Sequence, residues 1–304
     1  MRIAVIGIGG IGGYIGTKLC QRYSSGTEHE IIFIQRGEHF RMIKESGLLY
    51  ITKNEIIISP NAIYETTVNA GIFDLVFVNV KSRDLEQTAE SIKNNLDANS
   101  IIISTLNGVN NAKRLQKVLP NAIVLNGCIY VSSSIEKPGT IRQIGGSGNL
   151  VFGPENGDSK PYIHIEKLLN DAGLKAILSS DITKAVWEKY ILISTWASLS
   201  SKYAITIGAI LADKDKFEEL KSLLFEVLAI SKAKNVGLSD DIIQKCIDKY
   251  LTLPYENKTS MQLDFEAGKK PEYDVLTKYI VDCGDELGID VPAHRNVLQV
   301  LSNL

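Results

Sequence analysis

The sequence predicts an α/β fold, with a doubly wound parallel sheet in residues 1–180 and an all-helical domain in residues 181–304. Three observations lead to this prediction. Short apolar segments in the first half alternate with stretches long enough for helical crossovers. A glycine-rich turn follows the first apolar segment. Beyond residue 180, the long segments carry helical periodicity.

The strands expected in the first half are almost continuously apolar, which is typical of parallel strands with helices on both sheet faces. Two further strands are separated by Gly145–Gly148, and this glycine-rich gap predicts that they form a hairpin closing the first domain. The first set is Arg2–Ile6, Glu30–Gln35, Leu75–Val80, Ile101–Leu106 and Ile123–Leu125, and the hairpin pair is Thr140–Ile144 and Asn149–Phe152.

The boundary between the domains is expected in the turn-like stretch Ser179–Asp181. After it, apolar residues recur at helical spacing in five segments. These predicted helices are Ala185–Ser200, Lys214–Asn235, Asp240–Thr252, Thr259–Glu266 and Val275–Leu287.

The composition excludes several classes of protein. With 44% hydrophobic and 22% charged residues and a net charge of -2, the chain matches a globular protein without a field that attracts nucleic acid or membranes. Its apolar runs are too short to span a bilayer, and no signal peptide is evident. Four scattered cysteines and four histidines show no metal-ligand spacing, so we expect no metal and a cytoplasmic location. The oligomeric state is open, and a homodimer is compatible with the sequence.

The clearest motif is G-x-G-x-x-G, directly after the first strand and opening a helix, as in a Rossmann-type dinucleotide site. The first glycine permits a tight turn, the second lets a pyrophosphate approach the backbone, and the third allows helix and strand to pack closely. The helix N-terminus offers N–H groups to the phosphates, whereas the alternative is a glycine turn without a ligand. The predicted cofactor-binding residues here are Gly7, Gly9, Gly10, Ile11 and Gly12.

The end of the second strand indicates which cofactor binds. An NAD site places Asp or Glu there, but this strand ends in Gln35-Arg36. An arginine at this corner can pair with the additional phosphate of NADP, which a carboxylate would repel. We therefore predict NADP(H) as cofactor and Arg36 as its phosphate ligand, the alternative being a solvated loop arginine.

Polar residues follow two other strands at the sheet edge where ligands of such folds bind. Lys81 follows the third strand, and Asn107 with Gly108 follows the fourth. Lys81 is predicted to hold a cofactor phosphate or an anionic substrate, and Asn107 to orient the nicotinamide or the reacting carbonyl. The alternatives are a solvated lysine and an ordinary Asn-Gly turn.

A lysine, Lys189, lies near the start of the apolar stretch VWEKYILISTWAS. In a helix it shares a stripe with Ile193 and Ala197. Its methylenes can simply cover apolar surface while the amine reaches water. A lysine partly removed from water, however, gives up its proton more readily, because desolvation disfavours its charged form. It can then protonate the oxygen of a ketone that receives a hydride.

A last polar segment contains Asn257, Ser260 and Glu272. Ser260 lies near the start of a short helix, and Glu272 lies at or just before the start of the next one. A carboxylate at that place is favoured in its ionised form by the helix dipole, so simple capping is the alternative role for Glu272.

Taken in order along nearly the whole chain, these motifs resemble the ketopantoate reductases (2-dehydropantoate 2-reductases). The similarity includes the glycine loop, an arginine after the second strand, V-K after the third, N-G after the fourth, W-x-K opening the second domain and N-x-x-S-M near the end. The resemblance implies a Rossmann domain and a helical domain. It also implies hydride transfer from NADPH to the keto carbon of ketopantoate, in pantothenate and coenzyme A biosynthesis.

By this resemblance, the catalytic lysine matches Lys189 and the catalytic glutamate matches Glu272. Lys81 matches a lysine beside the cofactor, Asn107 an asparagine near the nicotinamide, and Ser260 with Asn257 the residues that hold substrate. The substrate is expected in the cleft between the two domains.

One departure concerns the substrate. Family members carry asparagines four and eight residues after the lysine, where this chain has Ile193 and Ala197. A buried polar substrate group without a partner costs about 1–3 kcal/mol. The alternatives are therefore the same chemistry on another branched 2-keto acid, or a non-catalytic NADPH-binding sensor, although a sensor would need only the first domain.

Overall fold

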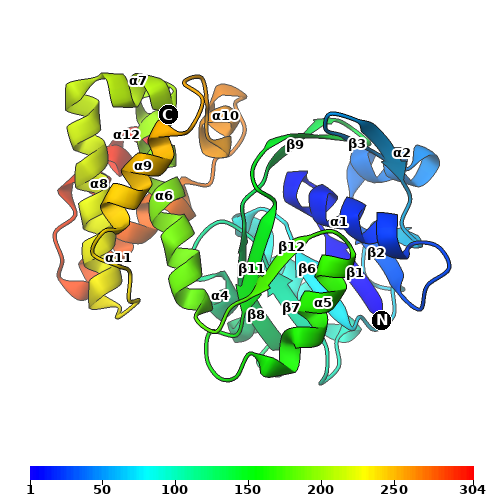
Figure 1. Ribbon diagram of the computed structural model, residues 1–304. Helices are drawn as coiled ribbons and strands as arrows, with labels where there is room; N and C mark the ends of the chain where they lie inside the picture. Colours follow the sequence, from blue (N-terminus) through cyan, green and yellow to red (C-terminus); the bar gives the residue numbers. More distant parts are fainter. The chain divides into compact units, whose positions relative to one another are not determined.

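The computed structural model describes residues 1–304, and the chain divides into two compact units (Figure 1). The first unit comprises Met1–Leu106 and Asn110–Ile182, and the second comprises Asn107–Val109 and Thr183–Leu304. By its contacts, the short loop Asn107–Val109 is thus part of the second unit, although in sequence it directly follows Leu106 of the first unit.

An eight-stranded sheet forms the centre of the first unit. Its strands pair in parallel, except that β11 runs antiparallel to β8. The spatial order is β12 (Lys175–Leu178), β11 (Asn149–Gly153), β8 (Ile123–Ile129), β7 (Ile101–Ser104), β6 (Leu75–Val78), β1 (Arg2–Ile6), β2 (Glu30–Ile34) and β5 (Ala62–Tyr64).

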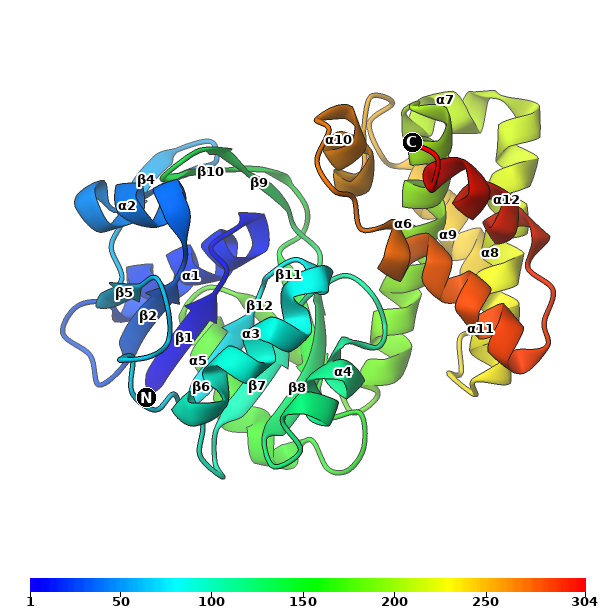
Figure 2. The same ribbon diagram turned by 180° about the vertical axis from the view of Figure 1, so that it is seen from behind.

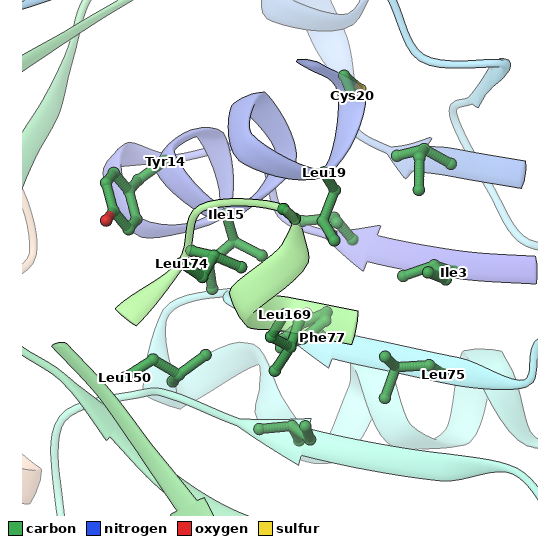
Figure 3. Close-up of a cluster of buried hydrophobic side chains, with 14 of the residues drawn as sticks. Ile3, Tyr14, Ile15, Leu19, Cys20, Leu75, Phe77, Leu150, Leu169 and Leu174 are labelled. Atoms are coloured by element: carbon green, nitrogen blue, oxygen red, sulfur yellow. The ribbon is translucent and has the colours of Figure 1, made fainter. Parts of the chain in front are cut away.

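Helices cover both faces of this sheet, which confirms the predicted doubly wound fold. Side chains alternate along a strand, so Ile3 and Val5 join one core cluster while Ala4 and Ile6 join the other. Figure 3 shows Ile15 and Leu19 of a covering helix above the first cluster. Figure 1 shows α1 (Gly10–Tyr23) and α5 (Ile163–Asp171) on one face, and Figure 2 shows α3 (Leu85–Ile92) and α4 (Asn111–Val118) on the other.

The connections place the glycine loop at a change of direction in the sheet. From β1 the chain continues to β2 on one side, whereas β6 and β7 lie on the other side of β1. Ligands of open α/β sheets bind outside the carboxyl ends of strands at such a switch point. The loops after β1 and β6 both start there, so the fold brings the glycine loop and the residues before Lys81 together.

A separate four-stranded sheet was not predicted, and it shows that the predicted hairpin is wrong. β10 pairs with β9 and β3, whereas β11 pairs with β8 and β12 of the large sheet. Gly146 and Gly148 have positive φ, so the glycine-rich stretch carries the chain from one sheet to the other instead of folding it back. The small sheet has the order β4 (Glu55–Ile58), β3 (Leu48–Ile51), β10 (Thr140–Gly145) and β9 (Ser132–Lys137).

The remaining elements of the first unit are one helix and three 3-10 turns. They are the helix α2 (Gly37–Ser46) and the 3-10 turns η1 (Ser82–Asp84), η2 (Lys93–Asn95) and η3 (Lys160–Tyr162).

The second unit contains only helices, as predicted, and α8 packs against α7, α9, α11 and α12. All five predicted helices are present, while α7 and α12 were not predicted. No helix combines the length and the apolar character that a bilayer span requires. The helices are α6 (Ile182–Tyr203), α7 (Ile207–Ala212), α8 (Lys214–Ala233), α9 (Ile242–Leu251), α10 (Ser260–Glu266), the π-helical segment η4 (Asp274–Lys278), α11 (Tyr279–Leu287) and α12 (Pro292–Leu301).

Candidate active site

The glycine loop has the geometry of a dinucleotide-binding turn. Gly7 has φ +83°, and a Cβ there would lie 2.9 Å from the backbone oxygen of Asn79, in the loop after β6. At Gly12 a Cβ would lie 2.0 Å from the oxygen of Gly7, so helix and loop pack too closely for a side chain. Gly9 differs, because a Cβ there would meet no atom within 4 Å. The space beside Gly9 is open to a ligand, which fits the close approach of a pyrophosphate.

The small sheet borders this loop. A Cβ at Gly10 would lie 1.8 Å from the backbone oxygen of Ser133 in β9, so this strand covers one side of the first turn of α1. Ile11 is partly buried and packs against the core. The side chains of this turn are thus occupied by packing, and its contribution to a cofactor comes from the backbone.

Two side chains near the carboxyl end of β2 stabilise this corner, and sequence reasoning did not find either role. The Gln35 amide oxygen accepts a hydrogen bond from the N–H of Ile8 at 2.7 Å, and its amide nitrogen donates to the Arg36 carbonyl at 3.1 Å. Nδ1 of His39 accepts from the N–H of Gly139 at 2.9 Å. Burial lowers the pKa of His39, which favours the neutral ring that can accept this bond.

The predicted cofactor residues Arg36 and Lys81 come after β2 and β6, the two strands that flank β1. Arg36 is exposed at the N-cap position of α2, and Lys81 is half-buried at the N-cap position of η1. Between the ends of β6 and β7, the Thr105 hydroxyl donates to the Asn79 side-chain oxygen at 2.5 Å. This bond joins the two strand ends that precede Lys81 and Asn107.

In the second unit the structure brings two predicted residues together. Lys189 of α6 is 7% exposed, and its Nζ donates to the side-chain oxygen of Asn107 at 3.0 Å. The amide oxygen compensates part of the cost of burying the ammonium. The ammonium group is a donor of protons and has no acceptor capacity, so it can act only as a hydrogen-bond donor or an acid toward an oxygen.

The predicted substrate residues Asn257 and Ser260 flank the start of α10. The N–H of Ile207 donates to the Asn257 carbonyl at 3.1 Å. Thr259 caps α10 by accepting from the N–H of Gln262, and its hydroxyl also lies 3.2 Å from that of Ser200 in α6. Ser260, the first residue of α10, is exposed, so its hydroxyl lies at the surface of this unit.

Glu272 is half-buried and directly precedes the next helix, as predicted. Its carbonyl accepts from the N–H groups of Val275 and Leu276, both at 3.3 Å. On α6, Ile193 is half-buried and Ala197 is 2% exposed. Both share the helix stripe of Lys189.

Comparison with known proteins decides the family. The family model for "Ketopantoate reductase PanE/ApbA" matches residues 3–157, and the model for the C-terminal part of the same family matches residues 181–304. The chain belongs to this family. It is an NADP-dependent oxidoreductase, as the resemblance implied.

Individual relatives cover this ketopantoate reductase family member almost completely. The uncharacterized oxidoreductase YkpB of Bacillus subtilis is 26% identical over 98% of this chain and 96% of its own length. The 2-dehydropantoate 2-reductase of Streptococcus pyogenes serotype M6 is 23% identical over 99% and 97%. The crystal structure of 2-dehydropantoate 2-reductase from Porphyromonas gingivalis W83 has a TM-score of 0.85 at 28% identity, over 99% of each chain.

Proposed function

We propose that the enzyme reduces ketopantoate to pantoate with NADPH, as a cytoplasmic step of pantothenate and coenzyme A biosynthesis. Family membership supports reduction of a 2-keto acid. The observation that carries the proposal is the buried Lys189 whose Nζ donates to Asn107. A buried lysine next to a loop at the carboxyl edge of the sheet is suited to give a proton to an oxygen that becomes negative.

Each predicted residue has a role in this proposal. The bound nicotinamide supplies the hydride, and Lys189 donates a proton to the ketone oxygen. Asn107 orients the lysine amine and the reacting carbonyl, and Glu272 orients the substrate and the lysine. Asn257 and Ser260 hold the hydroxyl or carboxylate end of the substrate.

The cofactor is held by the glycine loop through Gly7, Gly9, Gly10, Ile11 and Gly12. Arg36 binds the additional phosphate of NADP, and Lys81 lies beside the cofactor. The open space beside Gly9 supports this assignment.

A second substrate is favoured by one observation. Ile193 and Ala197, on the stripe of Lys189, offer no hydrogen bond to a substrate hydroxyl. A branched 2-keto acid without that hydroxyl avoids the loss of about 1–3 kcal/mol that an unpaired buried polar group costs.

The test is NADPH oxidation, followed by absorbance, with ketopantoate, its analogue without the hydroxyl and a panel of other 2-keto acids, repeated with NADH. Preferred turnover of ketopantoate supports the proposal, and preference for the hydroxyl-free analogue supports the second substrate. Tight NADPH binding without turnover of any keto acid would support the alternative that the protein is a non-catalytic NADPH sensor. Light scattering of the same sample tests whether the chain forms a homodimer.

A further inference from the structure

The helix that follows Glu272 does not begin as an ordinary α-helix. Its first part is the π-helical segment η4, Asp274–Lys278, in which the N–H of Tyr279 donates to the Asp274 carbonyl. π-Helical turns are rare and occur frequently at functional sites. Because the Glu272 carbonyl accepts from Val275 and Leu276 at the start of this segment, the position of Glu272 depends on the position of η4.

The hydroxyl of Tyr190 contacts η4 from α6. It donates to the carbonyls of Val275 and Leu276, at 3.1 and 3.0 Å, so one proton is shared between two acceptors. The side chain is 1% exposed and packs against Trp187 and Tyr279. Burial, reinforced by Tyr279 and Cys283, raises the pKa of Tyr190 well above its usual value, so the hydroxyl keeps the proton that it donates.

A second hydrogen bond joins the same two elements further along. The hydroxyls of Ser198 in α6 and Thr277 in η4 lie 2.6 Å apart, and both residues are fully buried. Ser198 lies on the stripe of α6 that contains Tyr190, about 12 Å along the helix axis at 1.5 Å per residue. Two separated bonds fix both the distance and the orientation of η4 relative to α6, which a single bond would not.

We propose that Tyr190 is a positioning residue, whose hydroxyl holds the Glu272 segment in register with Lys189, its neighbour in α6. The inference rests on the proposed function, in which Lys189 and Glu272 act on the same substrate. It adds a residue that touches neither substrate nor cofactor. The π-helical turn has a reason in this arrangement, because it presents two successive carbonyls to the Tyr190 hydroxyl.

The test compares Tyr190→Phe with Tyr250→Phe. Tyr250 is the matched control, because it is fully buried and its hydroxyl joins another helix to α6 without contacting η4. This hydroxyl donates to the Leu192 carbonyl at 2.6 Å and lies 2.9 Å from the Thr195 hydroxyl. Both substitutions delete one buried hydroxyl and keep the ring, so similar losses of thermal stability are expected. For Tyr190→Phe we expect kcat for the best keto acid to fall at least about tenfold, with the NADPH Kd within twofold. For Tyr250→Phe kcat stays within twofold.

Equal kcat losses in the two variants, or full kcat in Tyr190→Phe, would overturn the inference. If Tyr190→Phe does not fold, Thr277→Val removes the second bond with little change of shape, and the same loss of kcat is expected. Amide hydrogen exchange of residues 272–279 gives a readout independent of turnover. Exchange there should accelerate in Tyr190→Phe and not in Tyr250→Phe, and unchanged exchange contradicts the positioning role. Wild-type protein that turns over no keto acid removes the proposed function, and the exchange result then decides the positioning role by itself.

Discussion

The substitution Gly9→Ala separates the folding role of the glycine loop from its cofactor role. Gly9 has φ −81° and ψ −162°, which alanine adopts without strain, and its Cβ would meet no atom within 4 Å. A methyl group at this position therefore disturbs nothing in the protein itself. It projects into the space that the proposed pyrophosphate occupies, so its effect should appear only when the cofactor binds.

The expected magnitudes follow from this geometry. Replacing glycine by alanine at a compatible φ stabilises a protein by about 0.4–1 kcal/mol through the unfolded chain. Alanine is a poorer N-cap than glycine, which opposes this gain. We therefore expect the free energy of unfolding to change by less than about 1 kcal/mol. The NADPH Kd should rise at least about tenfold, which corresponds to about 1.4 kcal/mol.

Calorimetric titration with NADPH and thermal unfolding without cofactor measure the two effects. Gly12→Ala is the control, because its Cβ would lie 2.0 Å from the Gly7 oxygen and the backbone must shift, with a loss of about 1–3 kcal/mol of stability. A Gly9→Ala protein that binds NADPH as tightly as wild type would refute the assignment of this space to the pyrophosphate. A loss of stability in Gly9→Ala as large as in Gly12→Ala would refute the claim that a methyl group at position 9 disturbs nothing in the protein itself.

Three further predictions concern single side chains. Lys189→Met should abolish keto-acid reduction and leave the NADPH Kd, measured by titration, nearly unchanged. The control Lys202→Met, on the same helix, should retain turnover. Keto-acid reduction by the Lys189 variant would exclude this lysine as the acid. Arg36→Ala should weaken NADPH and not NADH in binding assays, and equal losses for both would remove the phosphate assignment. Burial lowers the pKa of His39, so below about pH 6.5 the histidine takes up a proton in the unfolded chain before it does so in the folded one. The stability that is present at higher pH is therefore lost as the pH falls toward the folded-state pKa. His39→Asn, which can keep an acceptor for Gly139, should make the melting temperature fall less between pH 7 and pH 5, and identical slopes would contradict this.

The elements that the sequence predicted well are those specified by local pattern. The parallel strands are apolar on both faces, and the glycine loop lies between a strand and a helix. The small sheet was not foreseen, because β9 reads Ser-Ser-Ser-Ile-Glu-Lys and is mostly exposed. β10 pairs with β3, which lies far away in the sequence, and no local signal specifies that pairing.

The same distinction holds for the candidate site. The residues next to Lys189 and next to Asn107 in the sequence predict each of them as a site residue, but the contact between the two, 82 residues apart, appears only in the folded chain. The segment Asp274–Lys278 reads as an ordinary helix start in sequence. Its π-helical form accompanies hydrogen bonds with Tyr190 and Ser198, which belong to another helix.

The inward orientation of the Gln35 amide has a consequence for changing the coenzyme preference. A glutamate introduced at position 35 would find the N–H of Ile8 within reach and turn toward it, as the present amide oxygen does. Its carboxylate would then accept a hydrogen bond from the N–H of Ile8 and not from the hydroxyls of an adenosine ribose. Redesign toward NADH should accordingly leave position 35 alone and place the acidic group at residue 36, whose side chain is exposed.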